Sequence, residues 1–132
     1  MPSKTDARAL ILVVDDNQDL LDVYGMYLTM NGFRVRTARD GLDGVRQAGA
    51  DAPVLILMDL QMPGLDGTAA MHTMRRIPQL RAVPIVAVTA HVLESQREAT
   101  LREGFDAVLS KPCMPGEIVR TVRRLLATGV RH

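Results

Sequence analysis

Four short apolar segments of this chain each end directly at a polar side chain. The side chains that follow them are, in chain order, Asp15 and Asp16, then Asp59, then Thr89, and finally Ser110 and Lys111. Unbroken runs of Val, Ile and Leu of this length are typical of strands buried on both faces of a parallel sheet. In an open sheet of this kind the ligand site lies beyond the carboxyl ends of the strands. We therefore expect these polar side chains to converge at one edge of a sheet.

The segments between the strands predict helices. We expect strands over residues 10–14, 33–38, 54–58, 85–88 and 107–109, and helices that begin near Asn17, Asp40, Asp66, Val92 and Ile118. The strand at 33–38 alternates instead of forming a solid apolar run, which favours a place at the edge of the sheet. This alternation with short loops predicts an α/β protein, a single doubly wound (βα)5 domain. The weak second strand fits a flavodoxin-like parallel sheet of order 2-1-3-4-5.

Helical periodicity also predicts which side chains face the core. The expected buried residues are Leu20, Tyr24, Tyr27 and Leu28 on the first helix, Leu42 and Val45 on the second, Ala70, Met71 and Met74 on the third, and Ile118, Val122, Leu125 and Leu126 on the last. The fourth helix, over 92–103, is polar all round. Few apolar anchors predict a loosely held element.

Length and composition set limits on the domain and its surroundings. The 132 residues suit one domain, expected over 9–127, with flexible tails at 1–8 and 128–132. A net charge of +1 provides no overall field for nucleic acid or a membrane surface, and the C-terminal arginines favour a solvated helix face. The single Cys113 fits a reducing compartment, and no apolar stretch approaches the ~20 residues of a membrane span. We expect a cytoplasmic protein.

The three aspartates at the predicted sheet edge call for a cation. We expect the carboxylates of Asp15, Asp16 and Asp59 to lie close together. Carboxylates that close cannot all stay ionised without a cation. A hard, oxygen-preferring metal ion suits this ligand set, and magnesium is the usual ion where phosphate is also bound. The sequence therefore predicts a Mg²⁺ site.

Four motifs together resemble a known family. They are Val-Val-Asp-Asp-Asn at 13–17, Met-Asp-Leu-Gln-Met-Pro-Gly-Leu-Asp-Gly at 58–67, Val-Thr-Ala at 88–90 and Lys-Pro at 111–112. Each alone is weak evidence, but in this order, at the ends of four successive strands, they resemble the receiver domain of two-component response regulators. The resemblance spans about residues 8–127.

The resemblance implies a role for each site residue. Asp59 would accept a phosphoryl group from the phosphohistidine of a sensor histidine kinase or a histidine phosphotransfer protein. Mg²⁺ would be held by Asp15, Asp16, Asp59 and the backbone carbonyl of Gln61. Lys111, in a cis bond to Pro112, would pair with Asp59 and contact the phosphoryl group, and Thr89 would donate its hydroxyl to it. Such a domain is a phosphorylation-controlled signalling module that catalyses only its own phosphorylation and dephosphorylation.

Two positions depart from the family pattern. Many receivers have Tyr or Phe three residues before the lysine, where this chain has Val108, and Cys113 follows Lys-Pro where an aromatic or aliphatic side chain is common. Phe105 is a poor substitute for the missing ring because it falls at a turn. His91, two residues after Thr89, either overhangs the phosphoryl group or is a solvated histidine at the start of a helix, and the sequence leaves both open.

Other functions remain to be weighed against this one. The module is either a single-domain regulator or the receiver of a larger regulator or hybrid kinase, with an unknown output partner and a homodimer through the fourth helix, fifth strand and fifth helix as one option. A Mg²⁺-dependent phosphatase with an aspartate nucleophile would need a second Asp two residues after Asp59, where this chain has Gln61. In a flavodoxin-like electron carrier, Asp15 and Asp16 would repel the flavin phosphate.

Overall fold

The computed structural model describes residues 8–90 and 93–128 as alternating strands and helices around one sheet. The strands are β1 (Leu10–Val14), β2 (Arg34–Ala38), β3 (Leu55–Asp59), β4 (Ile85–Thr89) and β5 (Ala107–Ser110). The helices are α1 (Gln18–Met30), α2 (Gly41–Ala50), α3 (Gly67–Arg75), the short 3-10 helix η1 (Pro78–Leu80), α4 (Glu94–Glu103) and α5 (Pro115–Thr128). His91 and most of the predicted tails at 1–8 and 128–132 lie outside these described residues.

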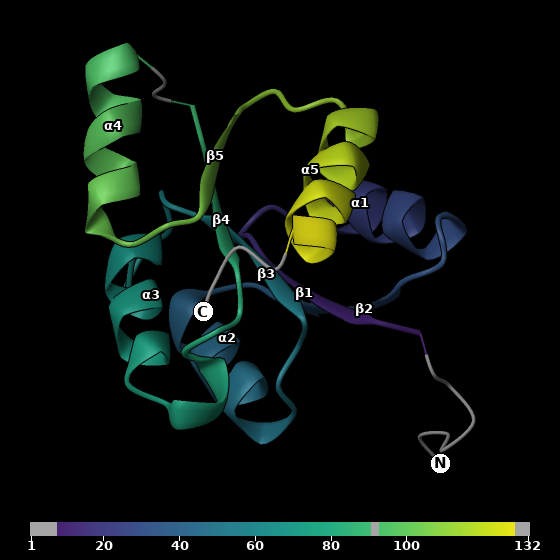
Figure 1. Cartoon of the computed structure of the whole chain (residues 1–132), viewed down its shortest axis with the longest axis horizontal. Helices are drawn as coiled ribbons and strands as arrows, with labels where there is room; N and C mark the ends of the chain where they lie inside the picture. Colours follow the sequence, from purple (N-terminus) through teal and green to yellow (C-terminus); the bar gives the residue numbers. More distant parts are fainter. Residues whose placement is uncertain (1–7, 91–92, 129–132) are drawn as a thin grey trace.

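The five strands form one parallel sheet in the order β2-β1-β3-β4-β5. This order confirms the prediction, and it leaves the alternating strand β2 at an edge. Helices α1 and α5 lie side by side on one face, while α2 and α3 cover the other face with α4 beside α3 (Figure 1). Strands β1 and β3 are neighbours at the point where the order of connection reverses, which is where ligands bind in doubly wound sheets.

Side-chain oxygens cap three of the helices. Asn17 accepts hydrogen bonds from the backbone N–H groups of Asp19 and Leu20 at the start of α1. The Asp40 carboxylate accepts a hydrogen bond from the backbone N–H of Asp43 at the start of α2, and the Asp66 carboxylate accepts one from the backbone N–H of Ala69 in α3. Each cap satisfies a backbone donor that the first turn of a helix leaves free. These three helices therefore each begin one residue after the predicted cap.

The predicted inward faces are correct for α3 and α5 and partly wrong for the first two helices. Helix α1 buries Leu21, Tyr24 and Leu28, whereas Tyr27 is 40% exposed. Helix α2 buries Gly41, Gly44 and Ala48, and Leu42 is 71% exposed. The backbone of α2 lies so close to β1 that a Cβ atom on Gly44 would be 2.9 Å from a Val14 methyl group. Small residues therefore occupy the face that the periodicity assigned to Leu42.

Helix α4 has few anchors in the core, as its polar sequence predicts. It buries no side chain among its ten residues. At its last residue, His72 Nε2 of α3 lies 3.2 Å from both the carboxylate and the backbone carbonyl of Glu103. Gly104 then ends the helix with a φ of +128°. Few buried contacts make an element easy to displace, so the start of α4 is its less constrained end.

A buried ion pair joins several segments at the amino edge of the sheet. Arg75 Nη2 lies 2.9 Å from Asp106 Oδ2, and these side chains are 14% and 8% exposed. The Arg75 guanidinium also donates to the carbonyl oxygens of Leu80, Val83 and Gly104. Asp106 in turn accepts from the N–H of Ile85. This pair connects α3 to the starts of β4 and β5.

Replacing Arg75 by methionine should therefore destabilise the fold. Removing one partner leaves the other charge buried and uncompensated, and we expect a loss of about 3 kcal/mol in the free energy of unfolding in urea. The exposed Arg76 provides the matched control, because Arg76→Met removes the same charge from the next residue. That variant should stay within about 0.5 kcal/mol of wild type. Equal losses in the two variants would contradict the role assigned to the ion pair.

Candidate functional site

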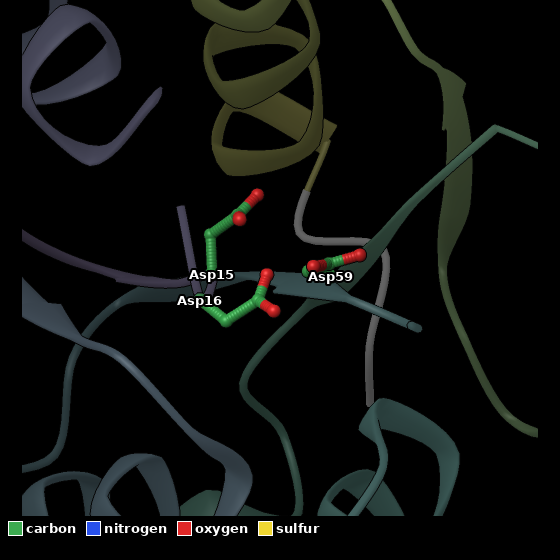
Figure 2. A group of neighbouring side chains, drawn as sticks. All are labelled: Asp15, Asp16 and Asp59. Carbon is green, nitrogen blue, oxygen red and sulfur yellow. The ribbon is translucent and has the colours of Figure 1, made fainter. Parts of the chain in front are cut away.

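Three carboxylates meet at the carboxyl edge of β1 and β3. Asp15 and Asp16 directly follow β1, and Asp59 is the last residue of β3. One oxygen from each carboxylate lies within 4.8 Å of the others. Figure 2 shows Asp15 and Asp16 leaving the chain in different directions, with Asp59 opposite them. The strand register explains this meeting, because Val14 pairs with Met58 and so places the next residues of both strands side by side.

Backbone hydrogen bonds fix two of these carboxylates. The N–H of Asn17 donates to Asp15 Oδ1 at 2.9 Å, and the N–H of Gln61 donates to Asp59 Oδ1 at 3.1 Å. Asp15 and Asp59 are each 2% exposed, whereas Asp16 is exposed. The site is therefore two oriented, buried carboxylates with a third at the solvent boundary.

Lys111 supplies the positive charge of the site. Its Nζ lies 3.3 Å from Asp59 Oδ1, as the resemblance implied, and also 3.1 Å from Asp15 Oδ2, a contact that sequence reasoning did not predict. The Lys111 N–H donates to the carbonyl of Thr89, and the Lys111-Pro112 bond is cis. No pattern in the sequence distinguishes Asp15 from Asp16 as the partner of the lysine, because only the strand geometry decides which of the two turns toward it.

Thr89 and Val108, the residue that replaces the family's usual aromatic side chain, lie on neighbouring strands. Thr89 ends β4 and is 3% exposed, one residue beyond Val88, which pairs with Asp59. Val108 lies on β5 and is 2% exposed, in the core cluster that also contains Phe105. The structure thus brings Asp15, Asp16, Asp59, Thr89 and Lys111 to one edge of the sheet.

Burial and like charge shape the titration of the site. Burial, together with the charge of Asp15, raises the pKa of Asp59 above the usual range of a carboxyl group, although the Gln61 N–H and Lys111 oppose the shift. Burial disfavours the ammonium form of Lys111, but its hydrogen bond to Asp15 and the charges of both carboxylates outweigh this and raise its pKa. The negative charge of the site therefore exceeds what its lysine compensates.

The raised pKa of Asp59 makes stability depend on pH. Above the ordinary carboxyl range, the folded protein retains a proton at Asp59 that the unfolded chain has lost, so stability falls as pH rises through this window. Asp59→Asn removes this ionisation and should be more stable than wild type above the window, by a margin that disappears as pH falls below the ordinary carboxyl pKa. Thermal melts from pH 3.5 to 8 in metal-free buffer test this. A margin that grows toward low pH would contradict it.

A buried tyrosine and a buried thiol lie in the core near this site. Tyr24 on α1 and Cys113 after β5 belong to one apolar cluster and are 3% and 7% exposed. Burial, with contributions from Cys113, Asp15 and Asp59, raises the pKa of Tyr24 to about 12, and burial raises the pKa of Cys113 to about 11. Both groups are therefore neutral at ordinary pH, and Cys113 packs in the core as a small apolar side chain would.

The chemistry of the donor set fits a divalent cation. Three carboxylates within reach of one another are the ligands that hard cations such as Mg²⁺ and Ca²⁺ prefer. Burial is the main cause of the raised pKa of Asp59, and repulsion by Asp15 adds to it; a bound cation would relieve this repulsion. No helix among the described residues is long and apolar enough to cross a bilayer.

Comparisons with known proteins give a consistent result. Residues 11–123 match the family model of the response regulator receiver domain. The chain is 36% identical over 116 residues to the transcriptional regulatory protein PrrA of Mycobacterium tuberculosis, covering 88% of this chain and 49% of PrrA. It is 28% identical to the polar-differentiation response regulator DivK of Brucella suis, covering 88% of this chain and 94% of DivK. This chain thus spans about half of PrrA and nearly all of DivK.

A solved structure shows the same fold with a metal. The receiver domain of the sensor histidine kinase PA1611 from Pseudomonas aeruginosa is 37% identical, with a TM-score of 0.81 over 89% of this chain and 97% of that domain. It was solved with a magnesium ion coordinated in its active site cleft.

Proposed function

Because this chain belongs to the response regulator receiver family, we propose that Asp59 accepts a phosphoryl group from a phosphohistidine on another protein. Receiver domains are phosphorylation-controlled signalling modules that take phosphoryl groups from sensor histidine kinases. The observation that carries the proposal for this chain is the meeting of three carboxylates with Lys111 at the carboxyl edge of β1 and β3. The aspartate-nucleophile phosphatase is not favoured by the comparisons.

The proposed reaction is a transfer from nitrogen to oxygen. A carboxylate oxygen of Asp59 attacks the phosphorus, the P–N bond breaks, and its electron pair returns to the imidazole as an acyl phosphate forms on Asp59. Lys111 already contacts both Asp15 and Asp59, so it can keep Asp15 as a partner while its ammonium turns to a phosphoryl oxygen. Val88 pairs with Asp59 in the sheet, and Thr89 is the next residue along β4. The Thr89 hydroxyl would donate a hydrogen bond to another oxygen of the phosphoryl group.

We propose that the metal of this site is Mg²⁺, held by Asp15, Asp16, Asp59 and the backbone carbonyl of Gln61. When bound, it supplies positive charge that offsets the oxygens of the transferred group. The magnesium in the cleft of the similar PA1611 receiver domain supports this choice. The N–H of Gln61 bonds to Asp59, which keeps the start of the loop that carries the carbonyl next to the carboxylates.

Magnesium should stabilise the folded protein. A ligand that binds only the native state at ten times its dissociation constant adds about 1.4 kcal/mol, which corresponds to a rise of about 5 °C in melting temperature. Asp16→Ala removes an exposed ligand and should lose most of this rise. Asp22→Ala removes an exposed aspartate that bonds to Gln18, away from the site, and should keep it. The same rise in both variants would contradict the assigned ligands.

The proposed partners are a sensor histidine kinase or a histidine phosphotransfer protein as donor, and an output protein whose identity the fold does not reveal. Purified donors labelled with ³²P should transfer their label to wild type but not to Asp59→Asn. If no donor in a broad panel transfers its label to the wild-type protein, the proposal is contradicted. A single domain over residues 9–127 and a cytoplasmic location remain predictions.

The route of the signal out of the site is also a proposal. We propose that it runs through Thr89 to α4, since α4 buries none of its side chains and Val108 has no ring that could turn inward. We also propose that α4, β5 and α5 form the face through which the domain pairs with a second copy of itself.

A further inference from the structure

An apolar groove lies beside the site, on the loop that follows Asp59. It measures about 320 Å³ and is lined by Asp40, Leu42, Pro63, Gly64 and Leu65. Leu42 begins α2 and is 71% exposed, although its position in the sequence predicted an inward side chain. A lone exposed leucine needs no explanation, but one that shares a groove with a proline and a half-buried leucine indicates a binding surface.

The walls of the groove are closely packed. The start of α2 packs directly on the loop, so that a Cβ atom on Gly41 would lie 2.3 Å from the Leu65 carbonyl oxygen and 3.3 Å from the Ala70 side chain. At the other end of the loop, a Cβ atom on Gly67 would lie 2.2 Å from the Asp59 carbonyl oxygen. The groove is thus held at a fixed position relative to the carboxylate of Asp59.

Its place in the fold points to one occupant. The carboxylate of Asp59 is 2% exposed, so a histidine that delivers a phosphoryl group must enter from the carboxyl edge, and the surface around it must rest on the loops there. The loop over 60–66 leads from Asp59 into the groove within a few residues. Another groove, lined by Arg8, Arg34 and Arg36, lies at the amino ends of β1 and β2 and is on the wrong edge.

We propose that the groove of Leu42, Pro63 and Leu65 binds an apolar side chain of the phosphohistidine protein that donates to Asp59. This inference rests on the proposed function and adds a contact that sets the choice of donor. The carboxylate of Asp40 at the rim of the groove favours a donor that carries a lysine or arginine next to that apolar side chain.

The test compares a protein donor with a small one. Leu42→Gln removes the apolar side chain without adding charge, and glutamine is as good a helix former as leucine. Transfer from the phosphorylated histidine protein that labels wild type fastest should slow by about tenfold, as for the loss of an interface anchor. Labelling by acetyl phosphate, which needs no docking surface, should stay within about twofold of wild type. Leu42→Met should restore transfer.

Leu101→Gln is the matched control, because it makes the same change on a 40% exposed leucine near the far end of α4, and it should transfer normally. Unchanged protein transfer in Leu42→Gln overturns the docking inference while leaving the proposed function intact. Loss of acetyl phosphate labelling as well would show that Leu42 acts on the site itself, which also overturns it. A dimer of wild type that Leu42→Gln dissociates, with normal transfer, would assign the groove to a second copy of this chain. If no phosphohistidine protein labels wild type, the proposed function fails first.

Discussion

Replacing Asp59 by asparagine should abolish phosphorylation by acetyl phosphate. Asparagine keeps the size of the side chain and an oxygen that can accept the Gln61 N–H, but its amide cannot form an acyl phosphate. Under the proposed assignment Asp15 and Asp16 hold the metal, so neither should accept the phosphoryl group in place of Asp59. Intact mass spectrometry in Mg²⁺ should show one added phosphate on wild type and none on the variant.

Asp66→Asn provides the control for this measurement. Asp66 lies in the same loop and caps α3, a role that asparagine fills equally well. We expect this variant to gain one phosphate at the wild-type rate. A phosphate retained by Asp59→Asn would place the acceptor elsewhere, with Asp15 and Asp16 the first residues to examine.

The sheet and the site could be predicted because both depend on where apolar runs end. A buried parallel strand needs apolar residues on both faces, so the first polar residue after it marks the carboxyl edge. Asp15, Asp59, Thr89 and Lys111 all lie at that edge. Parallel pairing in register then brings them together without any information about side-chain contacts.

The helix faces were harder to predict because the pattern records apolar side chains and not the distance of a helix from its sheet. On α1, apolar residues surround much of the helix, so that several stripes fit the sequence. The buried stripe contains Leu21 and leaves Tyr27 exposed, while Leu20 is half-buried against the core. On α2 the close contact with β1 is at Gly44, and Gly41 packs on the loop at Leu65. Neither glycine has a side chain that a hydrophobic pattern could register. The contact between Lys111 and Asp15 could not be predicted for a related reason, because the spacing of residues in a sequence does not determine side-chain rotamers.

Replacing Gly67 by alanine should destabilise the fold more than any other glycine-to-alanine change near the site. The new Cβ atom would lie 2.2 Å from the Asp59 carbonyl oxygen and 2.8 Å from the Leu60 Cα, and both are backbone atoms that no rotamer change can move. The start of α3 must then shift away from the loop, which breaks the hydrogen bond from the Gly67 N–H to the Leu60 carbonyl. We expect a loss of at least about 2 kcal/mol in the free energy of unfolding in urea.

Gly25→Ala should have the opposite sign and so serves as the matched control. Its Cβ atom would meet a Val35 methyl group at 3.7 Å, an ordinary contact, and alanine in the middle of α1 should raise stability by about 0.5–1 kcal/mol. The shift of α3 in Gly67→Ala also moves the backbone of Asp59 relative to Asp15 and Lys111, so its phosphorylation by acetyl phosphate should slow at temperatures where the protein is still folded. A Gly67→Ala protein as stable as wild type would show that the loop after Asp59 can yield. In that case the small size of Gly67 would not be what sets the position of β3 relative to α3.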